Sequence, residues 1–384
     1  MAVTSPTAAW QEKTGNQFAY DEYMEAEGLP IHRAAIGVAD VTALPRAPWK
    51  RTGGNGTFIQ LDGTFESERG LYVGDIPGGG VLTPQKHLYE EEIFVLEGRG
   101  ISQVWQGDGP KLTFEWGPGS VFAFPPNTTH VLLNGGPTPV VFMGVTSAPR
   151  VMNALYDWRM VFESDYQFVD IYTNGSTYFS APETKTTEGW YNQSNLRTNF
   201  IPDAHRILLD AHEQKVSGGQ LTGYRMGPRF PHGHLSEWPT GRYHKAHFHG
   251  PGAVLLGLDG EGYVLAWDTK YGARPYQNGH GDEVVKVEWG KNSIYVPPNS
   301  YFHQHFNTGA GPARHIAVYG EMLPLGVHDL AESDGSWRGH RSFREGGTLI
   351  EYEDEDPQVR ADFEAALGKN DLTCTMPQVT YRPD

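Results

Sequence analysis

Two similar segments, about 170 residues apart, constrain the fold of this chain more than any other feature. Ser120-Val-Phe-Ala-Phe-Pro-Pro-Asn is paralleled by Ser293-Ile-Tyr-Val-Pro-Pro-Asn, and a histidine and an asparagine follow each segment. In both, a short apolar run typical of a buried strand ends at a turn. Related units at this separation make an internal repeat. We therefore expect two copies of one β-rich unit.

Histidines are concentrated in the second copy. His247 and His249 lie in His244-Lys-Ala-His-Phe-His-Gly-Pro-Gly, and some fifty residues later comes His303-Gln-His305-Phe-Asn. Residues i and i+2 of a strand point to one face, so a third histidine from a second strand can close a cluster. Three neutral imidazoles inside a barrel can bind iron, manganese, nickel, copper or zinc. A chance run of histidines would not also bring the two turns and the alternating strands.

These segments resemble the two motifs of the cupin superfamily, which read G-x5-H-x-H-x(3,4)-E-x6-G and G-x5-P-x-G-x2-H-x3-N. His247 and His249 match the H-x-H pair, and Gly260 matches the closing glycine. Counting back from Gly260, the glutamate position of the motif falls on Ala253. The resemblance therefore implies a metal site without its usual carboxylate.

The second motif leaves a choice of third ligand. His303 and Asn307 match H-x3-N, but one extra residue separates the Pro-Pro-Asn turn from His303. His305 is therefore a rival third ligand. Both histidines share strand parity, so the direction in which they face does not decide between them.

The first copy matches the same motifs less completely. Its first motif is Lys86-His-Leu-Tyr-Glu-Glu-Glu-Ile-Phe-Val-Leu-Glu-Gly, and its second contains Phe124-Pro-Pro-Asn-Thr-Thr-His. The resemblance implies a second possible metal site, in which glutamine replaces the first histidine: Gln85, His87, Glu91 and His130. Two histidines and a carboxylate suffice for non-haem iron or manganese. The alternative is an inactive barrel in which Glu91 and His87 form a hydrogen bond.

The fold implied by the resemblance is all-β, with two cupin (double-stranded β-helix, jelly-roll) barrels in one chain, a helical linker and two terminal arms. The expected parts are an N-terminal arm (1–45), the first barrel (46–150), the linker (151–205), the second barrel (206–325) and a C-terminal extension (326–384). Helices are predicted around 17–27, at 150–159 and at 357–367. The arms could clasp the other barrel or another subunit, or pack on their own barrel; we expect a homo-oligomer.

Composition excludes several classes of protein. The net charge of −16 argues against nucleic acid as a partner, because phosphate repels an acidic surface. Cys374 is the single cysteine, which excludes an intrachain disulfide and fits a cytoplasmic location. The N-terminus lacks the basic and apolar segments of a signal peptide, and no apolar run is long enough for a membrane span.

The function implied by the resemblance is oxidative. Similar three-histidine cupins include gentisate-type ring-cleaving, diketone-cleaving and thiol dioxygenases. We expect Fe(II) on His247, His249 and His303, with O2 and a small aromatic or anionic molecule as substrates. Without an anionic ligand the metal keeps its full charge, which favours an anionic or bidentate substrate. Near the barrel mouth, Arg225, Arg242 and Tyr243 could hold it, although a solvated surface role is the default.

Two other functions remain open. One is a non-oxidative lyase, isomerase or decarboxylase that uses manganese, nickel or zinc. The other is a non-catalytic bicupin that binds or stores a small molecule. Of the remaining histidines, His244 could support the cluster, but its default is a surface position. His232 and His234 also have H-x-H spacing, but Pro231 and Gly233 favour a loop there, so we do not expect them to be ligands.

Overall fold

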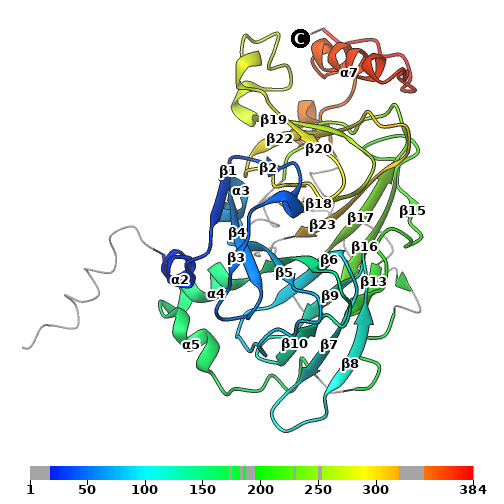
Figure 1. Ribbon diagram of the computed structural model, residues 1–384. Helices are drawn as coiled ribbons and strands as arrows, with labels where there is room; N and C mark the ends of the chain where they lie inside the picture. The colour runs from blue at the N-terminus through cyan, green and yellow to red at the C-terminus, as the bar shows by residue number, and fades with distance from the viewer. Residues whose placement is uncertain are drawn as a thin grey trace, which may run out of the picture.

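The computed structural model describes residues 18–172, 175–181, 185–186, 195–227, 231–249, 253–319 and 341–383. The chain forms two β-barrels packed against each other, the first in the lower half of Figure 1 and the second above it. Each barrel combines one large sheet with a three-stranded sheet. The all-β, two-barrel fold predicted from the repeat is confirmed.

The first barrel places a large sheet in the order β1-β4-β5-β11-β6-β9-β14 opposite the small sheet β10-β7-β8, and β3 joins at β4. The strands are β1 (Ile31–Ala34), β3 (Ala47–Pro48), β4 (Asn55–Leu61), β5 (Gly70–Ile76), β6 (Glu91–Glu97), β7 (Gly100–Trp105), β8 (Leu112–Trp116), β9 (Val121–Phe124), β10 (Thr129–Leu133), β11 (Val140–Thr146) and β14 (Phe200–Ile201).

The second barrel repeats this plan, with the large sheet β12-β13-β16-β17-β23-β18-β21-β2 opposite β20-β19-β22, and β15 joins at β16. The strands are β2 (Gly37–Val38), β12 (Lys185–Thr186), β13 (Asn195–Arg197), β15 (Asp210–Ala211), β16 (Gln220–Arg225), β17 (His232–Trp238), β18 (Val254–Asp259), β19 (Gly262–Asp268), β20 (Val285–Trp289), β21 (Ile294–Tyr295), β22 (Tyr301–Asn307) and β23 (Ala313–Tyr319).

The two barrels also exchange short strands. β2, from the segment expected to be an N-terminal arm, pairs with β21 of the second barrel. β14, from the segment expected to be a linker, pairs with β9 of the first barrel. Each exchange gives an edge strand a partner, which satisfies backbone groups that would otherwise remain unpaired. The segments outside the barrels are therefore part of both sheets.

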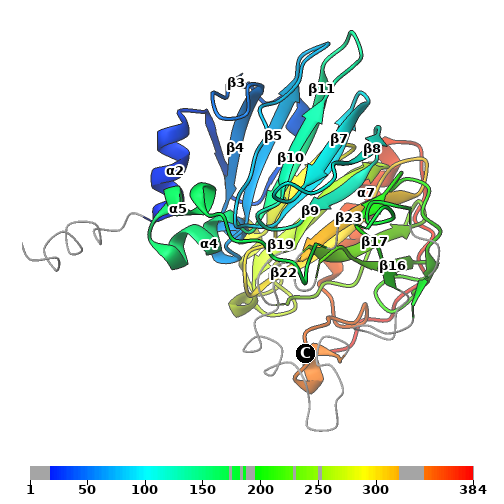
Figure 2. The same ribbon diagram turned by 90° about the horizontal axis from the view of Figure 1, so that it is seen from below.

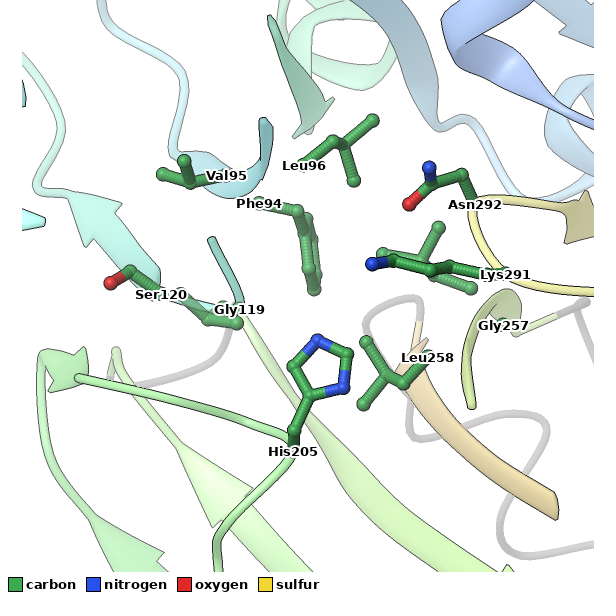
Figure 3. Close-up of a pocket in the computed structure, with 12 residues that line it drawn as sticks. Phe94, Val95, Leu96, Gly119, Ser120, His205, Gly257, Leu258, Lys291 and Asn292 are labelled. Atoms are coloured by element: carbon green, nitrogen blue, oxygen red, sulfur yellow. The ribbon is translucent and has the colours of Figure 1, made fainter. Parts of the chain in front are cut away.

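The outward faces of the two large sheets pack on each other and form a shared apolar core, in which Phe94, Leu96 and Val121 of the first barrel belong to the same cluster as Leu256 and Leu258 of the second. A small cavity lies at this junction, and Figure 3 shows Phe94, His205 and Leu258 around it. The backbone turns on its two sides repeat each other. Val95 donates to Ser120 O at 3.0 Å, and Gly257 donates to Ser293 O at 2.9 Å.

Helices cover one side of the first barrel. α2 (Ala19–Glu27), α4 (Ala148–Leu155) and α5 (Trp158–Glu163) gather beside it in both ribbon views (Figures 1 and 2), and α3 (Asp62–Glu66) follows β4. The single helix predicted at 150–159 is in fact α4 and α5. Tyr156 breaks it by adopting a left-handed conformation (φ 53°), and Asp157 then caps α5 by accepting a hydrogen bond from Arg159 N.

The C-terminal extension packs on the small sheet of the second barrel. Its helix α7 (Pro357–Lys369), red in Figure 1, buries Val359, Phe363 and Leu367. The predicted apolar spacing of this helix is therefore confirmed, and Asp356 caps it. The 3-10 turns are η1 (Val41–Ala43), η3 (Thr269–Tyr271), η4 (Gly281–Glu283) and η6 (Phe343–Glu345). Within the described ranges, no helix has the length and apolar character needed to cross a membrane.

Candidate metal centres

The first barrel brings His87, Glu91 and His130 together. Their ligand atoms all lie within 4.8 Å of one another, and all three side chains are buried. The Nε2 atoms of His87 and His130 lie 3.5 and 3.4 Å from the same oxygen, Oε2 of Glu91. The other oxygen, Oε1, accepts a hydrogen bond from the Tyr72 hydroxyl at 2.7 Å.

The hydrogen bonds around these imidazoles fit a cation. His87 Nδ1 donates to Tyr89 O at 2.8 Å and His130 Nδ1 lies 3.3 Å from Thr128 O. A neutral ring with its proton on Nδ1 has a lone pair on Nε2. Two such lone pairs facing one carboxylate need a metal ion or protons between them. Burial alone would raise the pKa of Glu91, but the hydrogen bonds from His130 and His87 outweigh it and hold this pKa well below its usual range.

Aromatic rings enclose this first group. Tyr89 stacks on His87 with 3.7 Å between ring centroids, and Phe124 stacks on His130 at 3.9 Å. The interior wall behind Glu91 is also filled, because a Cβ at Gly144 would lie 2.2 Å from the Tyr72 ring. The barrel therefore leaves little room for a substrate beside this group.

Gln85, expected as a weak fourth ligand, makes other contacts. Its amide nitrogen donates to the carbonyl oxygens of Arg51 and Thr83, each at 3.0 Å. Its backbone pairs with His130 in both directions at 2.9 Å. The backbone of Gln85 therefore occupies the position of a first motif residue, while its side-chain N–H groups hold the preceding loop.

The second barrel brings His247, His249 and His303 together, again with their ligand atoms within 4.8 Å of one another. His247 Nδ1 lies 3.1 Å from Lys245 O, and His303 Nδ1 lies 3.2 Å from Tyr301 O. These contacts favour rings with their protons on Nδ1 and their Nε2 lone pairs free for a metal. The residues present in both barrels thus fit the kind of metal site that the fold family implies.

A lysine enters the second site. Lys215 Nζ lies 2.7 Å from His247 Nε2. Burial lowers the pKa of Lys215 to about 8. Burial first, and then the charge of Lys215, hold the pKa of His247 well below its usual value. The ammonium group therefore lies where the lone pair of a metal ligand is directed.

The two copies correspond residue by residue at the ligand positions. His247 pairs with His303 through backbone hydrogen bonds of 3.1 and 2.9 Å, as Gln85 pairs with His130. The turns also agree. The residue three before each histidine has a left-handed backbone, with φ 57° at Asn127 and φ 59° at Ser300. Ser300 therefore takes the glycine position of the motif, and the apparent extra residue before His303 disappears. This correspondence favours His303 as the third ligand.

His305 belongs to a deeper layer of the second barrel. Its Nδ1 lies 2.9 Å from the Tyr295 hydroxyl, which also lies 2.7 Å from His315 Nδ1. His244 is part of this layer, because its ring lies 4.5 Å from the ring of Trp238 and 5.2 Å from that of His305. The default expectation that His244 is a surface residue is therefore wrong; it is buried.

His232 and His234 do not lie in a loop. They begin β17, where Gly233 is a strand residue paired with Tyr224 and Val318. The Pro-His-Gly-His pattern predicted a loop, and this prediction is wrong because a strand accepts glycine where a neighbouring backbone approaches closely. A Cβ at Gly233 would lie only 1.8 Å from Ala317 O. His234 Nδ1 contacts the Tyr319 hydroxyl.

The expected anion-binding residues do not surround the histidines. Arg225 is exposed on β16. Arg242 donates to Ser217 O at 2.6 Å. The Tyr243 hydroxyl donates to Glu355 of the C-terminal extension, and its ring stacks on Phe306, which points to the opposite face of β22 from His303 and His305. A catalytic role for Tyr243 is therefore unsupported, because the C-terminal extension buries this side chain.

The sequence analysis missed Lys215, although a signal for it exists. Lys215-Val-Ser-Gly-Gly precedes β16, and Lys50-Arg-Thr-Gly-Gly precedes β4 at the same spacing. This third repeated segment would have drawn attention to both lysines. It would not have distinguished them, since Lys50 is exposed and only Lys215 reaches a histidine.

Comparison with known proteins gives one family and several similar folds. Residues 58–162 match the family model described as Cupin. The coconut allergen cocosin is 12% identical, with 76% of this chain and 86% of that chain covered and a TM-score of 0.47. Oxalate decarboxylase from Lactobacillus farciminis, in a formate complex, is 10% identical (76% and 87% covered, TM-score 0.47). A deletion mutant of the Bacillus subtilis oxalate decarboxylase is 11% identical (78% and 85% covered, TM-score 0.47). Similarity at this level does not bear on the reaction.

No curated protein matches the chain. The family match covers most of the first barrel. The second barrel repeats its sheet order, its left-handed turn residue and its paired ligand positions. The first barrel therefore matches the cupin family, and the two barrels together give the chain the architecture of a bicupin.

Proposed function

We propose that the second barrel is the active site of a metal-dependent dioxygenase, with Fe(II) held by His247, His249 and His303. The observation that carries the proposal is a group of three imidazoles, with His247 and His303 buried, in which Ala253 stands at the position of the carboxylate. With three neutral ligands the metal keeps open positions and its full charge. A small molecule with two oxygen donors, one of them anionic, suits those positions best.

The contrast between the barrels supports the choice of site. The first group already contains a carboxylate, and Tyr89, Phe124 and Tyr72 cover it. The corresponding wall of the second barrel carries Ala317 at the register position of Gly144. Ala253 stands in place of Glu91, because each lies seven residues before the glycine that closes its motif. Ala253 therefore supplies no carboxylate at the position where Glu91 supplies one.

Each protein group has a defined part in the proposal. His247 and His303 hold their rings with Nδ1 against backbone carbonyl oxygens, which fixes the direction of Nε2. A bound Fe(II) would polarise a chelating substrate and pass electrons between it and dioxygen. Holding both molecules at one site removes the entropy cost of their encounter.

A non-oxidative reaction at the same site is the second candidate, and Lys215 favours it. A lyase, isomerase or decarboxylase that uses manganese, nickel or zinc needs a positioned proton donor. Lys215 places an N–H donor inside the site, 2.7 Å from His247. The two candidates differ in whether they need dioxygen.

The test begins with metal analysis of protein purified without chelator, followed by an oxygen electrode with hydroxylated aromatic acids and β-diketones. His303→Ala should reduce turnover by orders of magnitude, and the matched variant His130→Ala should reduce it much less. The reverse ranking would move the active site to the first barrel. Equal rates under argon and in air would replace the dioxygenase with the non-oxidative enzyme. Protein without stoichiometric metal would instead favour a binding or storage role.

A further inference from the structure

Within the described ranges, the hydrogen bond of the Lys215 ammonium group is one that a metal ion on His247 would remove. Its ammonium nitrogen lies 2.7 Å from His247 Nε2. A metal ion on Nε2 would use that lone pair, and it would also repel the ammonium group. In the part of the chain that the structure describes, Lys215 forms no ion pair with a carboxylate. Among the described residues, metal binding therefore leaves the buried cation beside the metal without an acceptor, and a buried charge of this kind is costly unless it is paired.

The backbone keeps Lys215 at this place. Its carbonyl oxygen accepts hydrogen bonds from Lys245 N at 2.7 Å and from the Tyr352 hydroxyl at 3.0 Å. Lys245 is two residues from His247, and Tyr352 belongs to the C-terminal extension. The base of the side chain is thus fixed from both sides of the site, so the ammonium group can turn but cannot leave.

Imidazoles surround the ammonium group. Lys215 Nζ lies 2.7 Å from His247 Nε2, and the rings of His249 and His303 lie 5.7 and 4.4 Å from the ring of His247. In the first barrel the matching space holds the Glu91 carboxylate, which balances its two histidines. In the second barrel that position is Ala253, and among the described residues no carboxylate lies beside the three histidines.

A second polar pair borders the same space. The strand registers place His234 where the first barrel has Tyr72, and Tyr319 where it has Thr146. Tyr72 donates to Glu91 in the first barrel. His234, held by the Tyr319 hydroxyl, is the side chain in the second barrel that corresponds to that donor.

We infer that Lys215 is the residue that recognises the substrate's carboxylate, and that this carboxylate takes the place in the second barrel that Glu91 takes in the first. The inference rests on the proposed function only in requiring a metal on the three histidines. It holds for an oxidative or a non-oxidative reaction. It narrows the substrate to a small acid whose carboxylate lies next to a second metal-binding oxygen, as in 2-hydroxy, 2-oxo or ortho-hydroxyaryl acids.

Two probes of nearly the same shape test this. Salicylate and salicylamide share the ring and the ortho hydroxyl, but only salicylate is anionic. Their binding to metal-loaded protein is measured by calorimetry under argon, so that no turnover is needed. The wild type should bind salicylate more tightly than salicylamide by at least about tenfold, the usual scale for pairing a buried charge. Lys215→Met should remove that preference and leave salicylamide binding within about twofold, and Lys215→Arg should restore most of it.

Lys270→Met is the matched control, because this exposed lysine of the same barrel pairs with Asp268 at 2.9 Å. It should leave the preference unchanged. Two results would overturn the inference and leave the proposed active site standing. In one, the wild type binds salicylate no more tightly than salicylamide. In the other, Lys215→Met keeps the preference for salicylate with its metal content unchanged. Different results would contradict the proposed function: His247→Ala would keep its metal, or His303→Ala would keep its turnover.

Discussion

Replacing Glu355 by glutamine should stabilise the protein in a pH-dependent way. Glu355 is 2% exposed in the C-terminal extension. Its oxygens accept hydrogen bonds from the Tyr243 hydroxyl and from Gln304 Nε2. A glutamine keeps an acceptor for Tyr243. Its new N–H takes the place of the oxygen that accepts from Gln304 Nε2, so the Gln304 amide turns over and presents Oε1, which has no hydrogen-bond partner among the described residues. The substitution therefore removes a buried charge while keeping the hydrogen bonds.

The expected difference in the free energy of unfolding follows from the pKa of Glu355. Burial raises the pKa of Glu355 from 4.5 to about 7, although the hydrogen bonds from Tyr243 and Gln304 oppose the change. Between these values the folded chain holds a proton that the unfolded chain has released. The free energy of unfolding therefore falls as the pH rises from 4.5 to 7. At about 1.4 kcal/mol for each pKa unit, charged Glu355 costs about 3 kcal/mol above pH 7.

The assay is urea unfolding of the wild type and Glu355→Gln at intervals between pH 4.5 and pH 8. The variant should be more stable by about 3 kcal/mol at pH 8, and the difference should shrink to nearly zero at pH 4.5. Glu345→Gln, an exposed position in the same extension, is the control and should give a small difference with no such slope. Turnover should be unchanged, because Tyr243 and Glu355 lie on the opposite face of β22 from the metal site.

Two results would refute this reasoning. A difference that stays constant with pH would mean that Glu355 does not hold a proton in the folded chain. A variant less stable than the wild type at pH 8 would mean that the hydrogen bonds of the carboxylate with Tyr243 and Gln304 stabilise the fold by more than burial of its charge destabilises it.

Three further predictions concern the sites and the packing. Ala253→Glu should supply a carboxylate beside the three histidines, raising iron retention and lowering turnover; metal analysis and steady-state rates check this, and unchanged retention would place residue 253 away from the metal. Tyr72→Phe should weaken metal retention in the first barrel by about 1.5–3 kcal/mol, the range for a hydrogen bond to a charged group, and leave the second barrel's metal in place, as metal titration would show. Phe363→Ala should cost about 3–5 kcal/mol, because this fully buried ring packs on Tyr243 and Phe306; a loss below about 1 kcal/mol on urea unfolding would mean that α7 is not an integral part of the second barrel's core.

Much of the fold could be read from local patterns. The glycines that close the first motif in each copy, Gly98 and Gly260, both have positive φ (82° and 86°). The helix at the C-terminus begins at Pro357, as predicted from its acidic cap and apolar spacing. These features depend on residues a few positions apart, which is why one sequence suffices for them.

Contacts between distant segments were not predictable in the same way. Tyr243 seemed to lie at the barrel mouth because it precedes His247, but the C-terminal extension covers it and its hydroxyl meets Glu355. His232 and His234 seemed to be loop residues until the register of β17 with β23 placed them in a strand. In each case the partner lies tens of residues away or more, and its position follows from strand register and packing.

The sequence by itself determined two cupin barrels and the positions from which ligands for a metal could come, because strand alternation, turn residues and motif spacing are local properties. Only the tertiary structure decided that Tyr89 and Phe124 stack on the histidines of the first barrel, while Lys215 contacts a histidine of the second. It also decided that Lys215, and not the equally spaced Lys50, reaches a metal ligand. Such choices depend on the volumes and charges of side chains brought together from separate strands, and no short stretch of sequence contains them.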